Sequence, residues 1–488
     1  MTEAGSSAVE PPPADHPRGA VARRGARLAA TLPAAPEQEA AQRRAVPAAH
    51  RAVMWAGIAV IALAFILFLS TLRERAGLDM TVYWRAAQVL HDANPSTDSL
   101  YAPSLVEVGG LDLPFTYPPA AALLFWPLGG MSLEQAWSIM EVANGLLLAA
   151  FAWLVLRLAP FSRSWFLIRP MPTLVAFAVT CGLCRHLYPT WFTYTFGQIN
   201  LLLAVLILAD FGRRRAGRRG TGFLTGMAAG IKITPAAMGL VPLAQGRWRT
   251  IAGMAAGLAF TVIVAAILLP REVVDFFTVQ LWSTGRVGDE GRIANQSLNG
   301  VLHLWGVPES LLSPLWLVLV VLTIALGAVG IRRVSRAGDQ FAATVIGAMI
   351  MLLISPISWE HHWVWVLPLV LALLPAHPRR TAAWQWAISI ALIVLLFVVF
   401  SENPSVRAAA YLGDTGATVV FNGSPTLDRL GTVPVLASIL ATAWVALRPR
   451  ALASEAIDPE LSAGEPIGPA RDQVREGAVE ATAPERRA

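Results

Sequence analysis

The sequence is poor in charged residues and in cysteine. Only 14% of its 488 residues are charged, against roughly 25% in soluble domains, while 55% are hydrophobic and the mean hydropathy is +0.54. These values exclude an ordinary soluble domain and predict an integral membrane protein. The two cysteines, Cys181 and Cys184, lie in one apolar segment at a spacing that disfavours a disulfide bridge on a helix. We interpret them as small core residues.

Lysine is almost absent as well. Lys232 is the only lysine, so arginine supplies nearly all of the positive charge behind the net charge of +6 and the pI near 9.9. The arginines lie mostly between apolar segments, where they indicate membrane topology and predict no nucleic-acid partner. They are expected on the cytoplasmic side, and the segments 73–116, 270–310, 357–361 and 402–429 on the other side. The arginines concerned are Arg43, Arg44, Arg51, those of 213–219, Arg332, Arg333, Arg336, Arg379, Arg380, Arg448 and Arg450.

Twelve apolar segments are long enough to cross a hydrocarbon core of roughly 30 Å. Each is expected to be helical, because an open strand cannot satisfy its backbone in lipid. Strict alternation would place the arginines of 213–219 outside, so we predict that 117–131 inserts only partially and that 221–243, interrupted by Thr234-Pro235, is broken or re-entrant. The segments are 53–72, 117–131, 135–158, 170–187, 191–211, 221–243, 251–269, 311–331, 340–356, 362–375, 382–401 and 430–447.

This pattern predicts an all-α polytopic membrane domain over residues 53–447, with about 10–12 transmembrane helices. Residues 1–52 are rich in alanine, proline and arginine and lack hydrophobic periodicity, so they are expected to form a disordered cytoplasmic tail. Residues 448–488 are expected to form a second one. No apolar stretch with a small-residue cleavage site precedes Val53–Leu72, so this run is predicted to be an uncleaved signal anchor.

An acid near the end of an apolar segment is the first candidate for chemistry. Asp79 follows the first predicted span, and an acid held where hydrocarbon meets water is a functional candidate. The polar, aromatic segments Pro114–Pro119 and Ser355–Trp363 also lie at the ends of apolar stretches on the side opposite the arginines. Together these segments predict one reaction centre at one membrane face.

Lys232 is the second candidate. An unpaired charge inside an apolar segment costs roughly 3 kcal/mol or more, so its ammonium requires an anionic partner, either a phosphate or a buried carboxylate. The alternative is a lysine whose ammonium reaches the lipid headgroups while its stem stays in the apolar layer.

The adjacent His361 and His362 are the third candidate. Neighbouring residues on a helix point about 100° apart, and no third ligand stands at a recognisable spacing, so a divalent metal is only weakly supported. Next to Glu360, the two imidazoles are instead predicted to hydrogen-bond a phosphate or a sugar. Neutral amides also suit hydroxyl-rich ligands. They are supplied by Gln198, Asn200, Asn295, Gln296 and Asn299, for which helix capping by Asn200 or Asn299 is the alternative.

Six ordered segments resemble the polyprenyl-phosphate-mannose-dependent mannosyltransferases of actinobacteria, which form glycosyltransferase family 87 of the GT-C superfamily. The resemblance runs in order from about residue 53 to about residue 447. The segments are Asp79–Tyr83, Phe115–Pro119, Gly197–Leu202, Gly230–Pro235, Asn295–Gly300 and Ser355–Trp363.

The resemblance implies a GT-C fold in the plasma membrane with its active site at the periplasmic face. It implies transfer of mannose from a lipid-linked monophosphate donor to a glycolipid or lipoglycan acceptor, a phosphatidylinositol mannoside or lipomannan. The acid of the first outer loop is then the catalytic base, which here is Asp79. We assign His361, His362 and Lys232 to the donor phosphate. Sugar and acceptor binding is assigned to Tyr83, Arg85, Tyr117, Gln198, Asn200, Asn295, Gln296 and Glu360, and no cofactor is expected.

A β-linked donor and an α-linked product require inversion at the anomeric carbon, for which one base suffices. We favour α-(1→2) linkages, with α-(1→6) mannosyl transfer and arabinofuranosyl transfer from decaprenyl-phosphoarabinose as alternatives. A transporter of lipid-linked sugars is disfavoured, because the polar motifs gather at one face and do not recur in the two halves of the chain.

Overall fold

The computed structural model describes residues 77–91, 99–108, 111–160, 182, 186–211, 221–376, 381–402 and 425–450. The chain divides into two units, and the first, Met1–Phe65, lies outside these residues, while the second, Ile66–Ala488, contains all of them. Several predicted features therefore lie outside the described residues. They are both tails except 448–450, the first span, most of the span 170–187, both cysteines and the arginines of 213–219.

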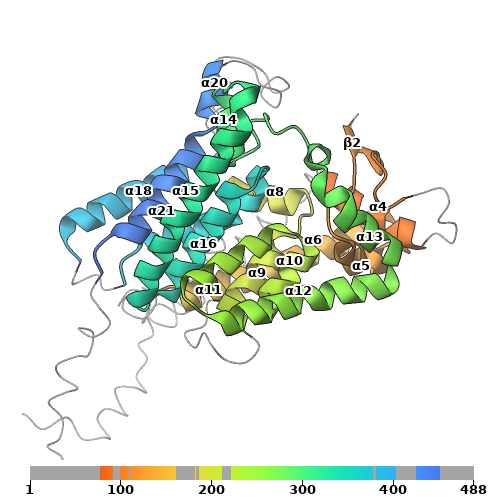
Figure 1. The fold of residues 1–488 in the computed structure, drawn as a ribbon, viewed down its shortest axis with the longest axis horizontal. Helices are drawn as coiled ribbons and strands as arrows, with labels where there is room; N and C mark the ends of the chain where they lie inside the picture. Colours follow the sequence, from red (N-terminus) through yellow and green to blue (C-terminus); the bar gives the residue numbers. More distant parts are fainter. Residues whose placement is uncertain are drawn as a thin grey trace, which may run out of the picture. The chain divides into compact units, whose positions relative to one another are not determined.

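Five helices in the described part of the chain are long and apolar enough to cross a membrane. Each coincides with a predicted apolar segment, and together they confirm a multi-pass α-helical membrane protein. Figure 1 shows α15 and α21 side by side, with α18 next to α21. The five are α6 (Leu133–Leu158), α12 (Trp248–Leu268), α15 (Glu309–Arg336), α18 (Ala383–Ser401) and the stretch formed by α20 (Pro425–Leu430) and α21 (Val433–Leu447).

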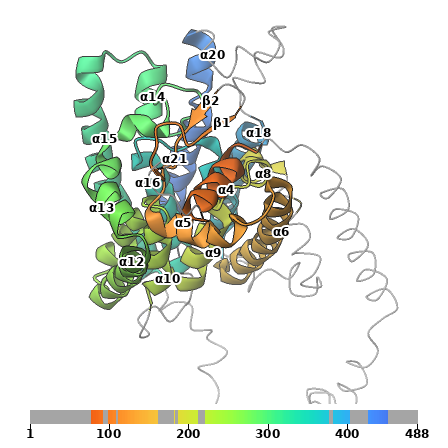
Figure 2. The same cartoon turned by 90° about the vertical axis from the view of Figure 1, so that its right-hand side faces the viewer.

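The other elements are shorter. Two of them, β1 and β2, form an antiparallel hairpin in which Val106 pairs with Leu113. Figure 2 shows this hairpin above α4, and α4 contacts β1, α5 and α6. The shorter elements are α4 (Leu78–His91), β1 (Val106–Val108), β2 (Leu111–Leu113), α5 (Pro119–Phe125), η2 (Trp126–Leu128), α8 (Tyr188–Thr195), α9 (Asn200–Phe211), α10 (Phe223–Ile231), η4 (Thr234–Gly239), α11 (Leu240–Ala244), α13 (Pro270–Thr278), η5 (Gln280–Trp282), η6 (Thr284–Val287), α14 (Leu298–Leu304), α16 (Gln340–Ile354), η7 (Glu360–Trp365) and α17 (Val366–Leu373).

Two predicted spans are interrupted, and each interruption carries candidate site residues. The break expected in 221–243 is confirmed, because α10 ends at Ile231 and Lys232 adopts an extended conformation before η4 begins. The segment 191–211 was predicted as one helix, but α8 and α9 meet at a bend of 120°. Gly197 lies in this bend with φ of +71°, a conformation that favours glycine, and a Cβ there would lie 2.7 Å from Met80 Cβ.

Helix α9 separates two hydrophobic cores. Leu201, Ala204 and Leu208 pack into a core built mainly from α15, α16, α17, α18 and α21. Ile199 and Leu203 belong to a second core, which is formed by α4, α5 and the beginning of α6. Because α9 and the residue before it contribute side chains to both cores, Asn200 at the start of this helix lies where the two cores meet.

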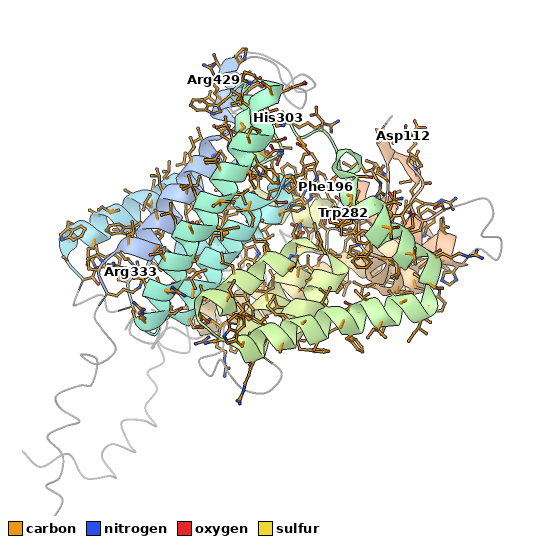
Figure 3. The ribbon with its side chains drawn as sticks, viewed as in Figure 1. Asp112, Phe196, Trp282, His303, Arg333 and Arg429 are labelled. Carbon is orange, nitrogen blue, oxygen red and sulfur yellow. The ribbon has the colours of Figure 1, made fainter. Side chains whose placement is uncertain are left out.

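Several arginines predicted to share the cytoplasmic side come together at one end of the helices. Arg333 donates to the carbonyl oxygen of Leu447 at 3.1 Å, and Arg448 donates to the carbonyl oxygens of Ala372, Leu373 and Leu374 at the end of α17. Figure 3 shows Arg333 near one end of α15, with Arg429 and His303 near its other end. Arginine near helix C-termini satisfies orphan carbonyls and complements the helix dipole.

Helix α10 is held against α12 by close backbone contact. A Cβ added at Gly226 would lie 2.0 Å from the carbonyl oxygen of Met254, and one at Gly257 would lie 2.0 Å from that of Phe223. Small residues permit such close approach between helices in a membrane. The contact fixes the end of α10, and therefore the place of Lys232.

We expect Gly226→Ala to destabilise the protein by about 1–3 kcal/mol, because the new methyl group would force α10 away from α12. Thermal unfolding of the detergent-solubilised protein measures this change. Gly145→Ala in α6 is the matched control, since a Cβ there meets nothing within 4 Å. Equal melting temperatures for the two variants would contradict the close packing of α10 on α12.

Candidate active site

The first turn of α4 carries Asp79, and this turn is attached to the bend between α8 and α9. Met80 N donates to Phe196 O at 3.0 Å, and Gly77 N donates to Thr195 O at 3.4 Å. A carboxylate in the first turn is also favoured by the helix dipole. The predicted catalytic acid is therefore placed directly against the motif that contains Gln198.

Two buried tyrosines and a buried amide surround this acid. The Tyr83 hydroxyl donates to Tyr117 Oη at 2.8 Å and to Gln198 Oε1 at 3.0 Å. Gln198 Nε2 lies 3.3 Å from Tyr117 Oη, and the Gln198 side chain hydrogen-bonds Asp79. The three predicted sugar-binding residues thus form one network with the predicted base.

Burial raises the pKa of Asp79 from 3.8 to about 6, while the hydrogen bond from Gln198 and the positive charge of Lys232 oppose this rise. Desolvation disfavours the charged carboxylate, whereas a donor and a nearby cation favour it. A pKa close to the working pH suits a group that accepts a proton during a reaction.

Lys232 lies at the end of α10, where three different elements approach its ammonium group. Nζ lies 2.9 Å from His362 Nε2 and 3.3 Å from Asn200 Oδ1, to which it donates. It also lies 5.3 Å from the centre of the Tyr117 ring and attracts Asp79 electrostatically. Since an ammonium is only a donor, Nε2 of His362 must accept, so this imidazole is neutral with its proton on Nδ1.

The two histidines lie in η7, and the neighbouring helices hold the backbone there. Asn200 Nδ2 and Thr193 Oγ1 each donate to the carbonyl oxygen of His361 at 2.8 Å. The His361 and His362 rings are nearly perpendicular, with centroids 4.7 Å apart. His361 Nε2 is buried without a hydrogen-bond partner. One ring nitrogen of the pair, His362 Nε2, therefore contacts Lys232, and another, His361 Nε2, has no hydrogen-bond partner.

Asn295 and Gln296 support the loop in front of the histidines through backbone contacts. Asn295 Oδ1 accepts from Ser358 N at 2.9 Å, and Asn295 Nδ2 donates to Pro356 O at 3.1 Å. Gln296 Nε2 donates to the carbonyl oxygens of Ile293 and Gly431. Both side chains are buried, so the described contacts make them supports of the loop, and sugar binding by them stays a prediction.

Arg85 and Glu360, also predicted to bind sugar or acceptor, are both half-buried. Arg85 Nη1 donates to Gln88 Oε1 at 3.4 Å on the same helix, and Glu360 N donates to Ala294 O at 3.1 Å. Neither contact connects them to the network around Asp79, so their assigned role also stays a prediction.

A small cavity of about 20 Å³ borders Lys232 and His362. Ser358 lines it, and the Ser358 hydroxyl is buried without a hydrogen-bond partner. Leu203, Ile207 and Trp365 line the cavity with apolar groups. This volume holds about one water molecule. Ser358 was not singled out by itself in the sequence, because a lone serine near a proline has no distinctive pattern.

A family model described as glycosyltransferase family 87 matches residues 115–356. A protein of Mycolicibacterium smegmatis, named polyprenol-phosphate-mannose-dependent alpha-(1-2)-phosphatidylinositol mannoside mannosyltransferase, is 32% identical over 65% of this chain and 74% of its own length. The chain belongs to glycosyltransferase family 87. A Mycobacterium tuberculosis protein of the same name is 30% identical over 71% of this chain and 82% of its own length.

A further relative of this family 87 chain comes from Mycolicibacterium smegmatis and is 28% identical over 76% of the chain and 85% of its own length. It is named polyprenol-phosphate-mannose-dependent alpha-(1-2)-phosphatidylinositol pentamannoside mannosyltransferase. No solved structure matched the chain. The match to the family 87 model, over residues 115–356, includes Tyr117, Gln198, Asn200 and Lys232, whereas Asp79 precedes it and the two histidines follow shortly after its end.

We expect Asp79→Asn to stabilise the folded protein near pH 7.5. Because the pKa of Asp79 rises from 3.8 to about 6 on folding, ionisation costs up to about 3 kcal/mol of stability above pH 6. This cost disappears as the pH falls from about 6 toward 4, where the native state binds more protons than the unfolded state. Thermal unfolding at several pH values should show a gain in Tm that shrinks with acidification. The control is Asp112→Asn, at an exposed acid of β2, and an equal gain there would contradict this assignment.

Proposed function

We propose that this family 87 enzyme transfers mannose from a polyprenyl-phosphate-mannose donor to a phosphatidylinositol mannoside and forms an α-(1→2) linkage. The names of the relatives support the donor, the acceptor and the linkage. The single observation that carries the mechanism is the convergence of Asp79, Lys232 and His362. They come from three distant segments, and Gln198, Asn200 and Tyr117 link them.

In the proposed reaction, Asp79 accepts the proton of the acceptor hydroxyl, whose oxygen attacks the anomeric carbon of mannose. The bond between that carbon and the phosphate oxygen breaks, and its electron pair leaves with the polyprenyl phosphate. Attack opposite the leaving group inverts the anomeric configuration, so a β-linked donor gives an α-linked product. No acid is needed, because phosphate is already a good leaving group.

Lys232 supplies the positive charge for the departing phosphate. Fixed cations that face developing negative charge stabilise the transition state most strongly where water is excluded. The Lys232 ammonium is half-buried, and its neighbour His362 is neutral and has an Nδ1–H to donate. The unpaired His361 Nε2 and the Ser358 hydroxyl provide further polar groups beside this charge.

We place this site at the periplasmic face of the plasma membrane. Helix α16 begins beside the ion pair of Arg450 and Asp339 and ends at Ile354, directly before the loop that carries His361. Its 15 residues span about 22 Å. Since arginine-rich ends favour the cytoplasm, the histidine end of α16 belongs to the opposite leaflet, within reach of lipid-linked substrates.

We expect Asp79→Asn to reduce transfer by about 10²–10⁴-fold, which is the usual contribution of a general base. Membranes containing the protein are incubated with synthetic polyprenyl-phosphomannose and phosphatidylinositol mannosides, and the product linkage is mapped. The wild-type kcat/KM should fall as the pH drops below about 6, because protonated Asp79 cannot accept a proton. Transfer that persists in Asp79→Asn would remove the proposed base, and a different linkage would change the proposed product.

We expect Lys232→Met to raise the donor KM by about 10–100-fold, since it removes a charge-assisted contact with the phosphate. His362→Gln should raise it by a smaller factor. The acceptor KM should stay nearly constant in both variants. Arg249→Met, which removes an exposed cation of α12, is the control. A normal donor KM in both site variants would refute the phosphate assignment.

A further inference from the structure

An arginine and a tyrosine outside the reacting cluster hold the backbone of the segment that contains Tyr117. Arg286 Nη2 donates to the carbonyl oxygen of Phe115 at 2.7 Å. The Tyr101 hydroxyl donates to the carbonyl oxygen of Tyr117 at 3.0 Å. The guanidinium of Arg286 also lies 5.5 Å from the centre of the Tyr101 ring. Two neighbouring side chains thus bind alternate carbonyls of one short segment.

The Phe115 and Tyr117 side chains are buried in the second core, but the backbone that joins them has no regular structure of its own. Residues 114–118 form neither helix nor strand, and Pro114 and Pro118 have no backbone N–H. The carbonyl oxygens of Phe115 and Tyr117 are therefore where side chains from other parts of the chain bind this backbone. A buried carbonyl that loses its donor costs about 1–3 kcal/mol, which is enough to displace an irregular segment.

The position of Tyr117 in turn affects the orientation of the Gln198 amide. Gln198 Oε1 accepts from Tyr83 and lies 3.4 Å from Tyr117 Oη, so Nε2 remains as the donor for Asp79. If Tyr117 shifted, the amide could rotate and direct its oxygen toward the carboxylate. Two acceptors facing each other repel, and the network around the base would be lost.

The outer loop that carries Arg286 also contacts the histidine side of the site. A Cβ at Gly288, where φ is +129°, would lie 2.9 Å from the Trp359 ring. Further along, Asn295 forms a β-bridge with Trp359. The same loop therefore touches both halves of the site, with Arg286 as its contact to the half that contains Asp79.

We propose that Arg286 and Tyr101 are positioning residues for the transfer reaction. They clamp the Phe115–Tyr117 backbone so that the Tyr117 hydroxyl keeps Gln198 oriented as a donor to Asp79. This inference rests on the proposed function of Asp79 as the base, and neither residue touches the substrate.

The variants for the test are chosen by the charged and titratable groups near Arg286, Tyr101 and Asp79. Asp79 is faced by Lys232, Tyr83 and Tyr117. Arg286 is faced by Tyr101 and Asp275. Replacing Arg286 removes a charge, whereas Tyr101→Phe removes only a hydroxyl group. An effect shared by the two variants therefore reports the clamp and not the charge of Arg286.

The experiment measures kcat/KM against pH, in membranes, for Arg286→Gln, Tyr101→Phe and the double variant. We expect kcat to fall by about 10–100-fold in each single variant, as for a small misplacement of a catalytic group. The donor KM should change much less. The acid limb of the profile should move to higher pH by at least about half a unit, because Asp79 loses its donor. The double variant should show no larger loss than the worse single variant, since both act on one segment.

Two further variants complete the test. Arg286→Lys retains a cationic donor and should recover part of kcat and most of the acid limb. Arg271→Gln, which removes an exposed arginine at the beginning of α13, should leave kcat and the pH profile unchanged. A wild-type acid limb in Tyr101→Phe, or losses that multiply in the double variant, would overturn the clamp. If Asp79→Asn were still active, the proposed base would fail instead, so the two failures are distinguishable.

Discussion

One ammonium group inside a largely apolar protein is the constraint on which the site depends. Lys232 cannot remain charged there without acceptors, and the structure supplies them from α9, from η7 and from the aromatic segment before α5. Each of these groups lies in or beside a break or an irregular stretch. The irregular backbone is tolerated because it faces other protein groups and the small cavity beside Lys232 and His362. Satisfying one charge therefore brings together segments that are distant in the sequence, such as Lys232 and His362, which are 130 residues apart. The predicted base, Asp79, also interacts electrostatically with Lys232.

The helices around the site provide a rigid frame for this arrangement. Helix α9 contributes residues to both hydrophobic cores, so a movement of Asn200 at its beginning would disturb the packing of both cores. The glycine contacts between α10 and α12 restrict Lys232 in the same way. Precise placement matters for chemistry, because an error of about 1 Å in a reacting group costs much of the rate. The close packing of apolar helices thus determines the geometry of a few polar atoms.

Much of this arrangement could be predicted from the sequence, but not all of it. Asp79, Gln198, Lys232 and His362 were recognisable because polar groups are costly next to apolar segments. A shared membrane face predicted the proximity of the other three, but Lys232 was not expected at that face. The bend at Gly197 was missed, since its apolar flanks read as one continuous helix. The contacts of Asn295, Gln296 and Arg286 with distant carbonyl oxygens were not predictable, because any residue offers such an acceptor and no sequence pattern identifies the partner.

The contact between Lys232 and His362 has a consequence for ligand discrimination. Lys232 already has a neutral acceptor in His362 and a nearby carboxylate in Asp79, so the local charges of Asp79 and Lys232 cancel. A small anion from the surrounding water would gain little binding free energy at Lys232, because it would have to displace His362 and approach the carboxylate of Asp79. A phosphate attached to a membrane-bound chain is concentrated at this depth by its tail and can compete. With Lys232 assigned to the donor phosphate as proposed, selection against free inorganic phosphate rests on this competition and not on a physical barrier.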